Sequence, residues 1–123
     1  MNRKTFYKFH QEFKRNGFVI LENALSENQL GLMRKQLDLW IDESRSHKTN
    51  FGKTIDGRPR FDLELSTHSS TKPALRRISS PIEISSDYLE ITRNNKALDL
   101  VAYIYGPNIK LLNTKINLKL PGS

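Results

Sequence analysis

The sequence contains no cysteine, and this absence removes several kinds of chemistry at once. Disulfides, thiolate metal sites and cysteine nucleophiles are all excluded within these residues. Histidine is also scarce: His10, His47 and His68 are scattered, and no pair has the four-residue spacing of a helical metal clamp. His10 and Glu12 would point away from each other on a helix, so they cannot share an ion. We therefore predict no metal ligands and no catalytic residues in this chain.

Glycine-rich loops and long apolar runs are missing as well. The six glycines are isolated, so there is no phosphate-binding loop, and no serine lies in a Gly-x-Ser-x-Gly elbow. No apolar run approaches the roughly 18 residues that a membrane span needs. The basic N-terminus is not followed by the apolar stretch of a secretory signal. We expect a cytoplasmic protein with no membrane partner.

What is present is ordinary globular material. The 123 residues are 37% hydrophobic and 27% charged, which indicates one domain, residues 1–123, with a single core. The net charge is +7, but the basic residues are scattered, whereas nucleic-acid binding usually shows as a stripe or cluster. We therefore interpret most of them as a solvated surface and expect no nucleic acid as partner, which leaves small acidic substrates open. A non-enzymatic basic α+β module that binds an acidic partner or nucleic acid remains the alternative.

Two segments near the N-terminus have the apolar spacing of amphipathic helices. The first is residues 5–16, and Gly17 is placed to end it in the left-handed conformation. The second is residues 26–44, which opens with a capping box formed by Ser26 and Gln29. The side chains expected in the core are Phe6, Phe9 and Phe13 from the first helix, and Leu30, Met33, Leu37 and Trp40 or Ile41 from the second.

A third helix is expected later in the chain. Asn95 is its cap, Leu98, Val101 and Tyr105 form its apolar stripe, and Gly106-Pro107 end it. A shorter helical turn, residues 87–92, precedes it.

Three shorter segments read as strands. Residues 18–21 are wholly apolar, the pattern of a strand covered on both faces. Residues 61–65 alternate, with Asp62 and Glu64 on the polar face, where two carboxylates could act as acid and base but more often face water. Residues 74–78 are either a short third strand or an extended segment that carries Arg76 and Arg77. The remaining polar segments are predicted to be loops or irregular: 45–60, 66–72 and 79–86.

The last stretch alternates with the period of two that a strand imposes. One face is apolar and can enter a core. The other face carries two amides and two ammonium groups, which could bind a small carboxylate ligand inside a barrel or simply face water on an edge strand. The apolar face comprises Leu112, Thr114, Ile116, Leu118 and Leu120, and the polar face comprises Asn113, Lys115, Asn117 and Lys119.

These residues resemble the opening of the phytanoyl-CoA dioxygenase family. The likeness begins with Asn-Gly-Phe-Val-Ile-Leu at 16–21, followed by Ala-Leu-Ser at 24–26 and a capped helix. It continues with Tyr-Gly-Pro at 105–107 and Leu-Pro-Gly-Ser at 120–123, which resembles the segment leading into the first iron-ligand motif. The resemblance spans nearly the whole chain.

The resemblance implies an α+β fold made of the N-terminal helices and first strands of a double-stranded β-helix, a cupin-like jelly-roll barrel. Members of the family are non-haem Fe(II), 2-oxoglutarate-dependent dioxygenases that hydroxylate small organic substrates, with iron held by two histidines and one carboxylate. The family's His-x-Asp follows shortly after the Pro-Gly turn. The chain therefore looks like a fragment or truncated member that is inactive and binds neither cofactor by itself.

The resemblance also assigns roles to individual residues. Lys119 matches a lysine that contacts the 2-oxoglutarate carboxylate, and Lys115 matches another position lining that pocket. Arg77, with Arg76 as the alternative, matches an upstream basic residue near the co-substrate. Asn113 lies where family members place a polar side chain that contacts substrate.

Overall fold

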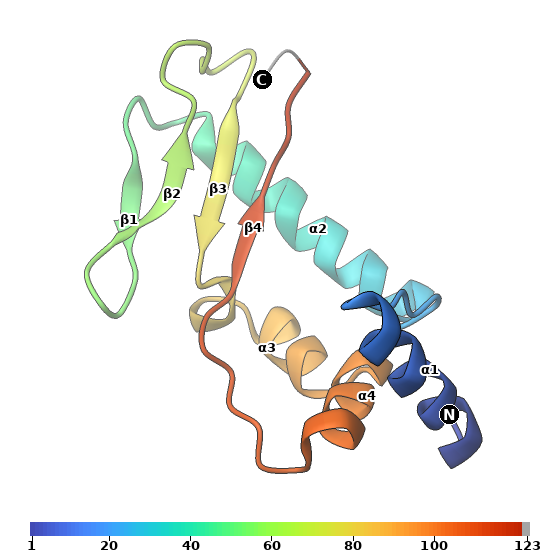
Figure 1. Ribbon diagram of the computed structural model, residues 1–123. Coiled ribbons are helices and arrows are strands. Elements are labelled where there is room, and N and C mark those ends of the chain that lie inside the picture. The colour runs from blue at the N-terminus through green and yellow to red at the C-terminus, as the bar shows by residue number, and fades with distance from the viewer. Residues whose placement is uncertain (122–123) are drawn as a thin grey trace.

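The computed structural model describes residues 1–121 and has the α+β fold class expected from the sequence (Figure 1). Two helices come first in the chain, three strands follow, and two further helices precede the last strand. No helix in this part of the chain is long and apolar enough to cross a membrane. In chain order the elements are α1 (Arg3–Asn16), α2 (Glu27–Ser44), β1 (Phe51–Lys53), β2 (Pro59–Leu63), β3 (Leu75–Ser79), the 3-10 helix η1 (Pro81–Glu83), α3 (Ser86–Arg93), α4 (Lys96–Tyr105) and β4 (Lys115–Asn117).

The four strands form one antiparallel sheet in the order β1-β2-β3-β4. Phe61, Ile78 and Ile116 occupy neighbouring positions across β2, β3 and β4, and all three pack into the core. Helix α2 crosses behind the sheet (Figure 1) and contributes Trp40 to the same core. One face of the sheet is therefore covered by α2. The remaining buried residues of the core cluster are Leu63, Leu75 and Tyr88.

The predicted helix ends are confirmed where the sequence carried a specific signal. Gly17 follows α1 with φ of 80°, a left-handed conformation that glycine adopts without strain, and its N–H donates to the Phe13 carbonyl. At α2 the Ser26 hydroxyl accepts from the Gln29 N–H at 3.1 Å, and the Gln29 side chain accepts from the Ser26 N–H at 2.9 Å. Asn95 caps α4 through the Leu98 N–H.

The prediction of a strand at residues 18–21 is wrong. The structure has no regular secondary structure there, and Phe18 and Ile20 are 61% and 71% exposed. A strand needs a neighbour to satisfy its backbone groups. The sheet of residues 1–121 is assembled from later segments, so this apolar run lies outside it.

Residues 45–60 were expected to form an exposed loop, and this is also wrong in part. They contain β1 and the start of β2, joined by a hairpin whose tip holds the predicted Asp56-Gly57 turn. Arg60, in β2, is only 5% exposed, and all of its contacts are with the protein. Its guanidinium forms an ion pair of 2.9 Å with Glu83 and donates to the backbone oxygens of Lys53, Ser79 and Ser80.

The apolar stripes of α1 and α4 pack against each other and do not enter the main core. Phe6 stacks on Tyr103 with ring centroids 5.2 Å apart, and Phe13 meets Tyr105 edge-on. The buried residue of α4 is Leu100, whereas Val101 and Tyr105, which were expected inside, are 40% and 67% exposed. These two helices therefore form a separate layer beside the sheet (Figure 1). The helical turn expected at 87–92 is present as α3.

The terminal strand has the predicted alternation but not the predicted length. Only Lys115–Asn117 is strand, and Leu112, expected on the apolar face, is 92% exposed. Ile116 and Leu118 do pack against the core. The Gly122 and Ser123 positions of the terminal motif lie outside the described residues.

Candidate functional site

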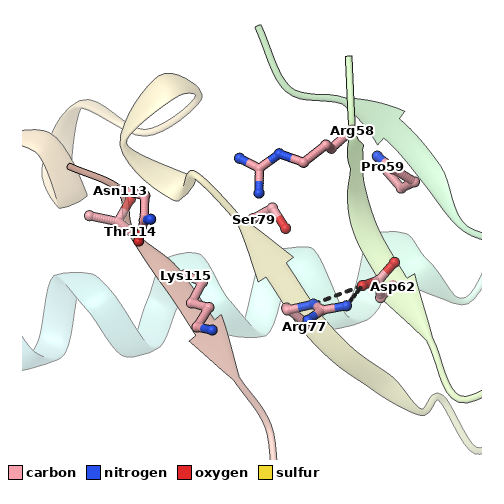
Figure 2. Close-up of a pocket in the computed structure, with 8 residues that line it drawn as sticks. All are labelled: Arg58, Pro59, Asp62, Arg77, Ser79, Asn113, Thr114 and Lys115. Carbon is pink, nitrogen blue, oxygen red and sulfur yellow. Dashed lines mark hydrogen bonds and ion pairs between the residues drawn. The ribbon is translucent and has the colours of Figure 1, made fainter. Parts of the chain in front are cut away.

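The face of the sheet opposite α2 is polar. Asp62, Arg77 and Asn117 occupy neighbouring positions across β2, β3 and β4, and Lys115 is opposite Ser79 on the adjacent row. Figure 2 shows Asp62, Arg77 and Lys115 on the side of the sheet away from α2. This arrangement follows from the period of two along each strand, because Phe61, Ile78 and Ile116 already occupy the α2 side. We refer to this surface as the open face.

An ion pair lies at the centre of the open face. The Asp62 carboxylate accepts from Arg77 Nε at 2.8 Å and from Arg77 Nη2 at 2.6 Å (Figure 2). Asp62 is 7% exposed, so the expected solvated carboxylate is instead buried and paired. Glu64 lies beyond the end of β2 and accepts from the Ser66 hydroxyl. Asp62 and Glu64 therefore do not form an acid and base pair.

The sequence-predicted site residues border several hollows, two of which include Arg77. Arg77, Lys115 and Asn113 line a hollow of about 370 Å³. Arg77 and Lys119 line a second hollow of about 320 Å³, together with Arg76. The structure thus places Arg77 at both hollows and assigns Lys115 and Lys119 to different ones. Four residues of extended chain span about 13 Å, which accounts for this separation.

The two lysines carry uncompensated charge. Lys115, Lys119 and Asn113 are all exposed, and within residues 1–121 their side chains have no hydrogen bond or ion pair. Arg77, in contrast, has its charge largely matched by Asp62. The free ammonium groups are therefore the main donors that the open face offers to an anion.

Sequence reasoning missed Arg58 as a member of the first hollow, because it assigned residues 45–60 to a loop. If the Asp56-Gly57 turn signal is interpreted as the tip of a β-hairpin, Arg58 falls immediately before the second strand of that hairpin. Asp56 binds Arg58 Nε through both carboxylate oxygens at 2.9 and 3.0 Å. Hydrogen bonds from the Thr54 hydroxyl and from Arg58 lower the pKa of Asp56 below its usual value. The ionised form of Asp56 is therefore favoured beside Arg58, in an ion pair whose two side chains are both mostly exposed.

The histidines take structural positions. His68 Nε2 lies 3.0 Å from the Ser44 carbonyl and 2.9 Å from the His47 carbonyl, and His68 Nδ1 accepts from the Ala74 N–H. His47 stacks on Phe51, and His10 meets Tyr103 edge-on. Within residues 1–121 no three side chains of metal-ligating type converge. The described residues therefore do not fit an iron centre.

No family model, curated protein or solved structure matches the chain.

Proposed function

We propose that this chain forms the N-terminal part of a non-haem Fe(II), 2-oxoglutarate-dependent dioxygenase of the phytanoyl-CoA dioxygenase type, which hydroxylates a small organic substrate. The observation that carries the proposal is the hollow that Arg77 and Lys119 border together. The sequence resemblance assigns Lys119 to the 2-oxoglutarate carboxylate and Arg77 to the neighbourhood of the co-substrate, whereas Lys115, which it also assigns to that pocket, borders the other hollow.

The architecture supports this proposal because only one face of the sheet is covered by a helix within residues 1–121. Its apolar face is closed by α2, while its polar face has no covering layer within residues 1–121. In a jelly roll of about eight strands a second sheet would cover such a face and make it the inside of a barrel. The exposed Lys119 would then lie in a water-poor interior, where a charge-assisted bond to a carboxylate is strong.

The residues present fit the co-substrate and not the metal. Lys119 has no competing partner in the described part of the chain and can bind one carboxylate of 2-oxoglutarate, with the ion-paired Arg77 beside it. When bound, 2-oxoglutarate supplies the two electrons needed for hydroxylation through its oxidative decarboxylation to succinate. Under this proposal the iron ligands belong to sequence that follows Ser123.

The coding sequence downstream of Ser123 and the activity of the longer polypeptide test the proposal together. We expect a His-x-Asp motif soon after residue 123 and a second histidine much later. The longer polypeptide should form succinate from 2-oxoglutarate only when Fe(II) is present. A stop codon at this position, or no metal-dependent succinate formation by the longer polypeptide, would contradict the proposal.

Binding to polyanions separates this function from that of a basic module. If the chain bound nucleic acid with an affinity that falls steeply with salt, and 2-oxoglutarate did not compete, the scattered basic residues would be the functional feature. We expect no such binding.

A further inference from the structure

The hollow beside Lys115 has properties of its own. It is bordered on one side by Arg58, at the entrance of β2, and on the other by residues leading into β4. Figure 2 shows the Arg58 side chain reaching from β2 across Ser79 toward Asn113. Arg58 uses Nε to bind Asp56, and within residues 1–121 its two Nη groups have no partner. Four N–H bonds of Arg58 are therefore available to a ligand.

A buried hydroxyl at the same hollow also lacks a partner. Thr114 Oγ1 is the one buried side-chain polar atom in residues 1–121 without a hydrogen bond. Its backbone carbonyl accepts from the Ser80 N–H at 2.8 Å, which fixes the residue beside the hollow. Buried polar groups nearly always have a partner. Because the hydroxyl is itself covered and Thr114 also borders a neighbouring hollow, this atom does not by itself assign a ligand to the hollow beside Lys115.

The charges around the hollow leave one cation unmatched. Asp62 offsets Arg77, and Asp56 offsets Arg58, whereas Lys115 has no counterion among the described residues. The available groups are nearly all donors: Lys115 Nζ, the Arg58 Nη groups and the Asn113 amide. A volume of about 370 Å³ is that of a small-molecule site. These features match an oxyanion, which is a compact set of acceptors with negative charge.

We propose that Arg58 and Lys115 form a binding site for a small oxyanion, either a carboxylate or a phosphate group, that is separate from the hollow beside Lys119. Arg58 contributes a planar pair of donors held in place by Asp56. Lys115 contributes the unmatched charge from β4, and Asn113 adds an exposed amide at the same hollow. This inference uses neither Lys119 nor any iron ligand, and it gives Lys115 and Asn113 a role other than the co-substrate and substrate contacts that the resemblance implies.

Titration of the chain with inorganic phosphate and with acetate, followed by amide and Arg Nε chemical shifts at constant ionic strength, tests the site and separates the two sources of oxyanion. We expect saturable shifts concentrated at Asn113, Thr114, Lys115 and the Arg58 Nε for one or both anions. Lys115→Met and Arg58→Met should each weaken the binding by about tenfold or more, because each removes a charge-assisted hydrogen bond.

Lys35→Met serves as the matched control, because it removes the same charge from the exposed surface of α2 on the far side of the sheet. It should bind the anion as the parent chain does. Shifts spread over all basic residues, or an affinity that Lys115→Met leaves unchanged while the spectrum stays folded, would overturn the inference. Because Lys119 lies outside this site, that result would leave the oxygenase proposal standing.

Discussion

Arg60 shows how much a single residue can determine in this fold. Its guanidinium holds together the β1-β2 hairpin, the end of β3 and η1 through Glu83 and three backbone oxygens. The Arg60 side chain is 6% exposed, so its charge depends on these partners in place of water. A charged residue in a segment of polar composition gives no sequence signal that it is buried, which is why the loop prediction failed there.

We expect Arg60→Met to lower the free energy of unfolding by about 3 kcal/mol, because it leaves Glu83 and several carbonyls without their partner. The neighbouring Arg58→Met breaks an exposed ion pair and should cost less than about 1 kcal/mol. Urea unfolding of the two variants measures the difference. Equal losses would show that Arg60 has no special role.

Tyr88 provides a pH-dependent test at the same scale. Burial raises the pKa of Tyr88 above its usual 10.0, and its hydroxyl donates to the Met33 carbonyl. Above pH 10.0 the unfolded chain releases this proton before the folded chain does, so the contribution of Tyr88 to stability decreases as pH rises.

We therefore expect Tyr88→Phe to be less stable than the parent by about 1 kcal/mol near neutral pH. This gap should narrow in alkaline solution, since phenylalanine has no proton to lose. Unfolding curves of both proteins at neutral pH and above pH 10.0 measure it. A gap that is constant or widens with pH would contradict the assigned burial effect.

At the scale of elements, the sequence was most informative where local chemistry decides the structure. The capping box of α2, the Asn95 cap of α4 and the glycine after α1 are local signals, and all three are confirmed. Strands depend on partners that lie far away in sequence. The apolar run 18–21 therefore failed as a prediction, and β1, three residues with Gly52 at their centre, was missed.

The terminal strand can be tested by comparing its two kinds of leucine. Leu118 packs against the core, whereas Leu112, expected on the same face, is 92% exposed. Leu118→Ala should cost about 1–2 kcal/mol, because its side chain is half-buried. Leu112→Ala should change stability by less than about 0.5 kcal/mol. Thermal or urea unfolding measures both, and a large effect at Leu112 would show that the strand extends further than Lys115–Asn117.

At the scale of the whole molecule, the candidate site exists because the sheet has an apolar face that packs against α2 and a polar face that does not. Alternation in the sequence predicted that Ile116 and Leu118 would face the core and that Lys115 and Lys119 would not, and the structure has this arrangement. The sequence could not show that the two lysines border different hollows or that Asp62 forms an ion pair with Arg77. Both features depend on the register between strands. The open face is thus a consequence of fold and pattern together.

The most direct measurement is the affinity for 2-oxoglutarate of the longer polypeptide that continues past Ser123, compared between Lys119→Met and Lys35→Met. Each variant removes one exposed ammonium group, but only Lys119 borders the hollow with Arg77. We expect Lys119→Met to weaken 2-oxoglutarate binding by about tenfold or more, and Lys35→Met to leave it unchanged. Equal affinity in both variants, with 2-oxoglutarate still bound, would contradict the assignment of the open face to the co-substrate.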